Sequence, residues 1–306
     1  MKPKDRITAA IRHEEPDRIP WGEIFIDDAV IKSFLQCKKV TFDERMEFAQ
    51  SLRLDLICQA PSIPILPGSI ALPEPSQTGW GDLDNWAAKS DSFIFILLDG
   101  AFEWGIKVFG IQKFLVSLMR GDAETTSFIR AIEVFNIELM RQAFDRGAMA
   151  VLLADDIAYQ RGLMADPVLL KRYILPSIAC LVEAAMPLGL PVFFHSDGNL
   201  TEILPGLAGS GIAGLHSLEA ASGMDLGMVK KAYGGRLCLW GGFNAACLTS
   251  PYSREIAEQI EPIIITGGEG WGFIFGSSSG LYKGVRPENL RSVRTALDKA
   301  DHAIEE

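Results

Sequence analysis

The amino-acid sequence predicts an α/β fold, a (β/α)8 TIM barrel formed by a single domain over residues 1–306. Segments that favour β-strands alternate with helical segments along the whole chain, as in proteins with a parallel sheet. The length of 306 residues fits one large barrel. No Gly-x-Gly-x-x-Gly follows an early strand, so the marker of a dinucleotide-binding sheet is missing.

The first hundred residues have the least regular pattern. Helices and strands are predicted in turn over Thr8–Arg12, Ile19–Ile26, Asp43–Leu52 and Leu54–Gln59. Between residues 61 and 100, five prolines break helices, and Phe93–Leu98 is a run of apolar residues. This composition predicts an N-terminal excursion of small strands.

From residue 109 onward, helices and strands alternate regularly. Helices are predicted over Ile111–Met119, Glu124–Arg146, Asp166–Pro187, Leu200–Ala208, from Asp225 to Gly234, from Ser250 to Ile265 and from Pro287 onward. The strands between them are Ala148–Ala154, Pro191–Phe194, Ala213–Leu218, Leu237–Trp240 and Gly272–Phe275. Asp166 is expected as an N-cap, Gly234 at a C′ position, and Leu290, Val293 and Leu297 as one apolar stripe.

Composition excludes several classes of protein. Lys and Arg total 29 against 39 Asp and Glu, a net charge of -10, which disfavours nucleic-acid binding. No apolar run is long enough to span a membrane, and no signal peptide is recognised at the start. The five cysteines are scattered without a Cys-x-x-Cys pair, so a disulfide framework is not expected and a reducing cytoplasm is predicted.

Polar residues recur directly after the predicted strands. In a barrel these carboxyl ends surround one common mouth, where active sites form. The residues in such positions are Glu23, Asp27, Asp155, Asp156, His195, Asp197, His216, Glu219, Asn244 and Ser277–Ser279. The recurrence predicts a site at this end of the barrel.

His195-Ser196-Asp197-Gly198 is the most specific element of this series. An imidazole and a carboxylate two residues apart at a strand end point the same way and could ligate a divalent metal. Glu219, Asp155 or Asp156 could add an oxygen ligand. Alternatively, His195 and Asp197 bond each other and cap the helix after Gly198.

The other strand ends offer acid/base and substrate-binding groups. Asp155 and Asp156 form an acid/base pair or a substrate clamp, unless one of them caps the following turn. Trp21 and Trp240 are candidates for lining a flat-ligand pocket. The remaining substrate-binding candidates are Glu23, Asn244 and Ser278, the last within a Ser-Ser-Ser-Gly turn that binds an anion or is simply flexible.

Several short motifs together resemble the uroporphyrinogen decarboxylase superfamily. They are Arg6-Ile7-x-x-Ala10, Pro16-Asp17-Arg18-Ile19-Pro20, Phe102-Glu103, Gly110, Asp155-Asp156, His195-Ser196-Asp197-Gly198, Leu218-Glu219, Gly223-Met224-Asp225, Tyr233-Gly234, Gly241-Gly242 and Pro287-Glu288-Asn289. The resemblance spans nearly the whole chain in the right order. It implies a (β/α)8 barrel with its cleft at the carboxyl ends of the strands.

The resemblance implies one of two chemistries. True uroporphyrinogen decarboxylases use no metal, and an Arg-Gln-x-Gly-Arg segment lines their pocket for a polycarboxylate tetrapyrrole. This chain has Glu23 in that region, and Arg161 is its obvious later cation. The other branch contains zinc-dependent methyltransferases with a His-x-Cys turn and a later Cys. Here the turn holds His195 and Asp197, and serines occupy 277–279.

The resemblance favours the methyltransferase branch with oxygen ligands. It implies a zinc ion held by His195 with Asp197 and Glu219, Asp156 as the acid, and Asp155 beside it. A small molecule would donate the methyl group, and the corrinoid would arrive on a separate protein, because no Asp-x-His-x-x-Gly occurs. Decarboxylation of a tetrapyrrole carboxylate and a non-catalytic barrel that binds a corrinoid or tetrapyrrole remain alternatives. A homodimer is one assembly left open.

Overall fold

A computed structural model describes residues 1–64, 71–251 and 254–304. The chain divides into two compact units. Unit 1 contains Met1–Cys58, Ala88–Phe93 and Gly214–Glu306, and unit 2 contains Gln59–Ala87 and Ile94–Ala213. No helix among the described residues is both long and apolar enough to cross a membrane.

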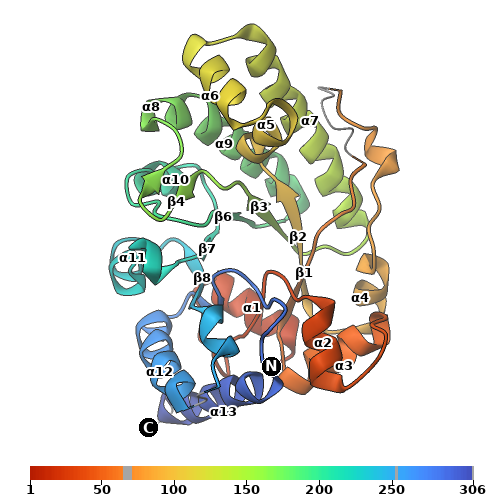
Figure 1. The fold of residues 1–306 in the computed structure, drawn as a ribbon, viewed down its shortest axis with the longest axis vertical. Helices are drawn as coiled ribbons and strands as arrows, with labels where there is room; N and C mark the ends of the chain where they lie inside the picture. The colour runs from red at the N-terminus through yellow and green to blue at the C-terminus, as the bar shows by residue number, and fades with distance from the viewer. Residues whose placement is uncertain (65–70, 252–253, 305–306) are drawn as a thin grey trace. The chain divides into compact units, whose positions relative to one another are not determined.

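Unit 2 is built on three parallel strands that follow one another in chain order (Figure 1). They are β2 (Phe93–Asp99), β3 (Ala150–Ala154) and β6 (Val192–His195), with Ile96 opposite Val151 and Leu152 opposite Phe193. Each strand is buried along nearly its whole length, as in parallel sheets covered on both faces. Phe95 and Phe193 pack edge to face with ring centroids 5.1 Å apart.

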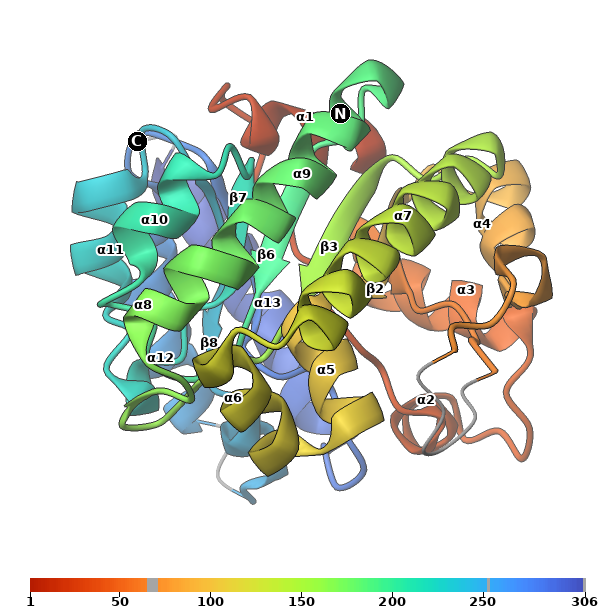
Figure 2. The same ribbon diagram turned by 90° about the horizontal axis from the view of Figure 1, so that it is seen from above.

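Unit 2 also contains several helices. They are α5 (Ala101–Phe109), α6 (Ile111–Arg120), α7 (Ala123–Asp145), α8 (Pro167–Leu169), α9 (Leu175–Ala185) and α10 (Leu204–Gly209). Helices α7 and α9 lie side by side (Figure 2). A short hairpin of β4 (Ala158–Tyr159) and β5 (Gly162–Leu163) follows β3.

Unit 1 contains a second group of parallel strands. They are β1 (Leu56–Gln59), which ends at the unit boundary, β7 (Gly214–Ser217), β8 (Cys238–Phe243) and β9 (Phe273–Ser277). Strands β7, β8 and β9 pair in chain order. The helices are α1 (Pro3–Ile11), α2 (Asp28–Leu35), α3 (Phe42–Leu52), α11 (Leu226–Tyr233), α12 (Arg254–Gly268) and α13 (Pro287–Ile304). The predicted α/β class with parallel strands is confirmed.

The predicted strand over Ile19–Ile26 forms only isolated bridges. Trp21 pairs with Phe275 and Gly22 with Leu56, both in parallel. Pro20 has no N–H to donate to a ladder, which limits regular pairing here. A Cβ on Gly22 would lie 2.1 Å from Leu56 Cγ, so the close approach requires glycine.

The predicted excursion of small strands is wrong for most of its described residues. Apart from one antiparallel bridge between Ser62 and Gly79, the segment forms a 3-10 turn at Pro75–Gln77 and the helix α4 (Leu83–Lys89). Phe93–Leu98 belongs to β2, whose continuous apolar run is typical of a strand buried on both faces. Part of the predicted excursion, residues 65–70, lies outside the described residues.

Two of the predicted helix signals are confirmed, and one differs. Asp166 accepts a hydrogen bond from Val168 N at 2.8 Å, and the α13 stripe of Leu290, Val293 and Leu297 is buried. Gly234 has φ -60°, so the left-handed C′ position is wrong. A Cβ there would lie 2.5 Å from the Lys230 carbonyl oxygen, which explains the glycine by close packing.

Candidate metal centre

Three side chains with metal-ligand chemistry converge in unit 2. One ligand atom each from Asp156, His195 and Asp197 lies within 4.8 Å of the others. Asp156 follows β3, and His195 ends β6, the neighbouring strand. The register places Ala154 opposite His195, so the parallel strands bring both loops to the same sheet edge.

Three hydrogen bonds join the two loops that carry these residues. Asp155 N donates to the His195 carbonyl at 2.9 Å, and Ile157 N donates to Ser196 Oγ at 3.1 Å. Asp197 N donates to Asp156 Oδ1 at 2.9 Å. Backbone and side-chain groups of the two loops therefore fix the loops to each other. This positions Asp156, His195 and Asp197 before any metal ion binds.

Gly198 allows the turn after the ligands to pack closely. Its φ is +88°, and a Cβ would lie 2.4 Å from Tyr159 N. The next residue, Asn199, donates its N–H to the Tyr159 carbonyl at 3.0 Å. The turn after Gly198 is therefore in contact with the β4–β5 hairpin.

The imidazole of His195 has the properties of a ligand. Its side chain is 11% exposed, and Nε2 lies 3.9 Å from Asp156 Oδ1. Burial lowers the pKa of His195, although Asp197 and Asp156 oppose this by favouring the charged form. A neutral imidazole offers the lone pair that a metal requires. The Asp156 side chain is 48% exposed, so the cluster is open to solvent.

The donor set fits a divalent cation. Zinc takes nitrogen and carboxylate ligands at roughly 2.0–2.2 Å, so two ligands of one ion lie about 3–4 Å apart. The separation of 3.9 Å between His195 Nε2 and Asp156 Oδ1 falls in this range. Two carboxylates would balance the charge of the cation, and three protein ligands leave a position for substrate.

Asp155 has a different position from its neighbour. Its carboxylate accepts backbone hydrogen bonds from Phe102 at 3.2 Å and Glu103 at 2.6 Å, so it caps the start of α5. Burial raises the pKa of Asp155 to about 8, despite these backbone donors. Gly100 makes room for it, since a Cβ would lie 2.3 Å from Asp155 Cγ.

Three further charged residues of unit 2, Asp99, Glu103 and Lys107, were not predicted as site residues from the sequence. Lys107 Nζ lies 2.7 Å from Asp99 Oδ2 and 3.4 Å from Glu103 Oε1. Burial raises the pKa of Glu103; Lys107 lowers it, and Asp99 and Asp156 raise it further. Asp99 ends β2, so the strand-end signal was available, but its strand was assigned to the predicted excursion.

The predicted substrate-binding residues lie in unit 1, and several have internal partners. Glu23 is buried and accepts hydrogen bonds from Trp21 Nε1 at 2.8 Å and from the hydroxyl and N–H of Ser277. Burial raises the pKa of Glu23 to about 7, against these hydrogen bonds. Trp240 Nε1 donates to the Gly22 carbonyl at 3.0 Å. Trp21 and Trp240 are 1% and 0% exposed.

The other predicted residues of unit 1 occupy turns. Asn244 is exposed, and its Oδ1 accepts from Ala246 N at 3.0 Å, so it caps a 3-10 turn. Ser278 is buried, and its N–H donates to the Phe243 carbonyl at 2.9 Å. Glu219 accepts from the Ser222 hydroxyl and is outside the three-residue cluster. Substrate contact by Trp21, Glu23, Trp240, Asn244 and Ser278 stays a prediction, as does ligation by Glu219.

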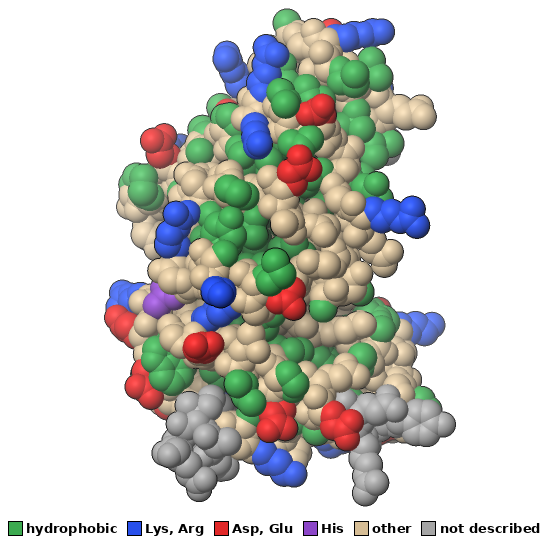
Figure 3. Space-filling view, turned by 90° about the vertical axis from the view of Figure 1, so that its left-hand side faces the viewer, with side chains coloured by type: hydrophobic (Ala, Val, Ile, Leu, Met, Phe, Trp, Pro, Cys, Tyr) green, Lys and Arg blue, Asp and Glu red, His purple; other side chains and the backbone are tan. Residues whose placement is uncertain are grey.

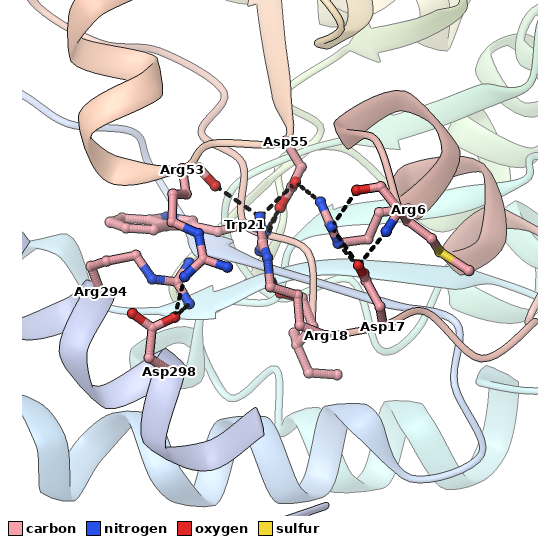
Figure 4. A network of polar contacts seen from close by, with 10 residues as sticks. Arg6, Asp17, Arg18, Trp21, Arg53, Asp55, Arg294 and Asp298 are labelled. Atoms are coloured by element: carbon pink, nitrogen blue, oxygen red, sulfur yellow. Dashed lines mark hydrogen bonds and ion pairs between the residues drawn. The ribbon is translucent and has the colours of Figure 1, made fainter. Parts of the chain in front are cut away.

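A separate polar network in unit 1 surrounds Asp55 (Figure 4). Arg18 Nη1 and Nη2 donate to its two oxygens at 2.8 Å each, and Trp21 N donates at 2.9 Å. Arg6 forms ion pairs with both Asp55 and Asp17. Asp55 directly precedes β1, so this network lies at the amino end of a strand, where barrel residues usually serve stability.

Comparison with known proteins agrees with this architecture. The family model for uroporphyrinogen decarboxylase (URO-D) matches residues 105–300. A solved methyltransferase from Methanosarcina mazei has a TM-score of 0.74 and 15% identity, covering 98% of this chain and 99% of that one. A search of curated proteins found no match.

A second solved structure is less similar. It is a B12-independent methionine synthase from Shewanella sp. W3-18-1 in complex with selenomethionine, with a TM-score of 0.51 and 13% identity. The match covers 73% of this chain and 65% of that one. At these identities both structures support the fold. The family match confirms the resemblance found in the sequence: the chain belongs to the uroporphyrinogen decarboxylase (URO-D) family.

Proposed function

We propose that this protein is a methyltransferase in which Asp156, His195 and Asp197 hold a zinc ion. The observation that carries the proposal is the convergence of these three ligand atoms at the ends of β3 and β6. The family match and the structural likeness to a methyltransferase support the reaction class.

Zinc would supply Lewis-acid chemistry at the heteroatom of the methyl donor, making it a better leaving group. The chain's own residues contribute charge and position. His195 supplies a neutral nitrogen because burial lowers its pKa, and the two aspartates supply negative charge. The hydrogen bonds between the loops reduce the reorganisation needed to bind the ion.

Asp156 was predicted as the general acid, but ligation and proton donation by one carboxylate exclude each other. We assign it to the metal. Glu103 then becomes the candidate proton donor, since burial raises its pKa and Asp156 is among the charges that influence it. Asp155 supports α5 and is assigned a structural role.

The remaining parts of the proposal come from the sequence. A small molecule donates the methyl group, and a corrinoid on a separate protein accepts it, because this chain has no corrinoid signature. The cytoplasm is the proposed compartment. A (β/α)8 barrel over one domain is the proposed complete fold, supported by the chain-order pairing in each unit.

Decarboxylation of a tetrapyrrole carboxylate is the second candidate, favoured by the description of the matching family. The acids of unit 2 argue against it. Asp99, Glu103, Asp156 and Asp197 gather with Lys107 as a nearby cation. A polyanionic substrate would be repelled there. Turnover of uroporphyrinogen that is insensitive to chelators would establish this candidate instead.

Metal analysis tests the leading proposal. Protein purified without chelator should hold about one zinc per chain. His195→Ala and Asp197→Asn should lower zinc occupancy at least about tenfold, because each removes one ligand. Asp225→Asn, at the N-cap of α11, is the matched control and should keep wild-type occupancy.

Thermal unfolding provides a second readout. Added zinc should raise the melting temperature of chelator-treated wild type but not that of His195→Ala. Folded wild-type protein that binds no zinc, or His195→Ala with full occupancy, would contradict the proposal. Glu219→Gln tests the predicted fourth ligand separately: unchanged zinc affinity would remove Glu219 from the set.

A further inference from the structure

A groove on unit 2 lies apart from the metal cluster and shares no residue with it. It runs between α7 and the start of α9, has a volume of about 460 Å³, and is lined by Arg130, Arg172, Tyr173 and Glu133, among others. This volume is within the range of small-molecule pockets, roughly 300–1,000 Å³. Figure 3 shows Lys and Arg side chains beside hydrophobic ones at the top of the view, where α6 and the start of α7 lie in Figure 1.

A π-helical turn forms one wall of the groove. Leu170–Ile174 adopt this wider turn directly before α9. Pro176 lines the groove and has no N–H, so it cannot complete the regular bonding of the preceding turn. Such π-turns are rare and occur often at functional sites. The turn carries both Arg172 and Tyr173 to the groove.

The two guanidinium groups are not neutralised by acids. Within the ranges that the structure describes, neither Arg130 nor Arg172 forms an ion pair, whereas Arg141 on the same helix pairs with Glu138 at 3.6 Å. Arg172 instead stacks over the Tyr173 ring at 5.1 Å. The groove therefore carries two guanidinium groups in a chain of net charge -10.

We infer that this groove binds a small organic dianion with an apolar part. The two arginines provide charge-assisted hydrogen bonds, as planar guanidinium groups do for phosphate and carboxylate. Tyr173 can add a hydroxyl donor, while Ile129 and Pro176 provide apolar contact. Glu133 leaves a net lining charge of +1, so a dianion is favoured over a neutral molecule.

Phenyl phosphate is the probe, measured by calorimetry on the intact protein. Arg130→Gln and Arg172→Gln should each weaken its binding at least about tenfold, because each loses a charged hydrogen bond. Arg141→Gln, on α7 but outside the lining, is the matched control and should bind as wild type. Both groove arginines are exposed, so the melting temperature should confirm folded variants.

Glu133→Gln gives a test of opposite sign. Removing this carboxylate should strengthen phenyl phosphate binding severalfold, since it repels an anion. Succinate distinguishes the source of the charge: binding comparable to phenyl phosphate indicates a dicarboxylate site, and much weaker binding indicates a phosphoryl site. Either result supports a dianion.

Cys180 provides a local readout because its thiol lines the groove. Phenyl phosphate should slow labelling of Cys180 by an uncharged maleimide and leave Cys37 labelling unchanged. No binding at millimolar concentration would overturn the inference. So would binding that ignores Arg130→Gln and Arg172→Gln, or that weakens with Glu133→Gln. None of these outcomes depends on zinc or on methyl transfer, so the two proposals fail separately.

Discussion

Asp55 and Asp155 are both buried aspartates beside a parallel strand, but different groups bind their carboxyl oxygens. Asp55, at the amino end of β1 in unit 1, is bonded by the guanidinium groups of Arg6 and Arg18. Asp155, after the carboxyl end of β3 in unit 2, accepts two backbone N–H groups, and burial raises its pKa to about 8. Cations therefore favour the charged form of Asp55, whereas burial favours the neutral form of Asp155 and backbone N–H groups bind its oxygens.

Asp55→Asn should have the largest effect on stability. The change gives the nearly buried Arg18 a neutral partner in place of a charged one, and Arg6 keeps its ion pair with Asp17. Breaking a buried pair in this way costs about 3–5 kcal/mol. Urea denaturation should show a lower free energy of unfolding, and a loss below about 1 kcal/mol would contradict the stabilising role of the network.

Glu23 is another buried carboxyl of unit 1, and its hydrogen-bond donors are neutral. Burial raises the pKa of Glu23 from 4.5 to about 7, so the folded protein binds this proton more tightly than the unfolded chain. The stabilisation is present below pH 4.5 and is lost as pH rises through about 7.

Between pH 4.5 and about 7, Glu23 should lower the free energy of unfolding by up to about 1.4 kcal/mol per pH unit. Glu23→Gln keeps an oxygen acceptor but cannot ionise. Unfolding free energies measured from pH 4 to pH 8 should therefore vary less in this variant than in wild type. Equal pH dependence in both proteins would show that folding does not raise the pKa of Glu23.

Gly198→Ala tests the loop contact that supports the cluster. An added Cβ would meet Tyr159 N at 2.4 Å, and φ is +88°. Gly162→Ala is the matched control, since its φ is also positive, at +140°, but open space surrounds it. We expect Gly198→Ala to lose about 1–3 kcal/mol and the control about 1 kcal/mol. Zinc affinity should fall only in Gly198→Ala; equal affinities would disprove the supporting role of the turn.

Asp298→Asn should have the smallest effect. Asp298 bonds Arg53 at 2.7 Å and Arg294 at 2.6 Å in the same region of unit 1 (Figure 4). Its side chain is 41% exposed, so water screens these pairs. The expected loss is below about 1 kcal/mol in urea denaturation. A loss equal to that of Asp55→Asn would mean that burial does not explain how much Asp55 and Asp298 each contribute to stability.

The sequence predicted the cluster because strand ends are local signals. Val151–Leu153 and Val192–Phe194 are apolar runs, and Asp156, His195 and Asp197 follow or end them directly. The capping of α5 by Asp155 was not predictable in this way, because its partners Phe102 and Glu103 are more than fifty residues away. The π-turn before α9 was also not predicted, although Pro176 inside a predicted helix was a signal for irregular hydrogen bonding.

Other predictions that differ from the structure also relied on the local sequence pattern alone. Phe93–Leu98 carried a strong strand signal, but neighbouring prolines led to its assignment to an excursion, and Asp99 was lost with it. Trp21 and Trp240 were assigned from their strand positions. Their burial depends on packing around β8 and β9, which no local pattern contains.

Asp155 and Asp156 are consecutive residues with separate tasks, and this adjacency has a mechanical consequence. One peptide bond, with its Cα atoms about 3.8 Å apart, connects the cap of α5 to Asp156, a proposed metal ligand. If α5 shifts, the shift is transmitted to Asp156 with little slack. A displacement of the α5–α6 hairpin, linked at Gly110, would thus move Asp156 and change the affinity of the proposed site for an ion.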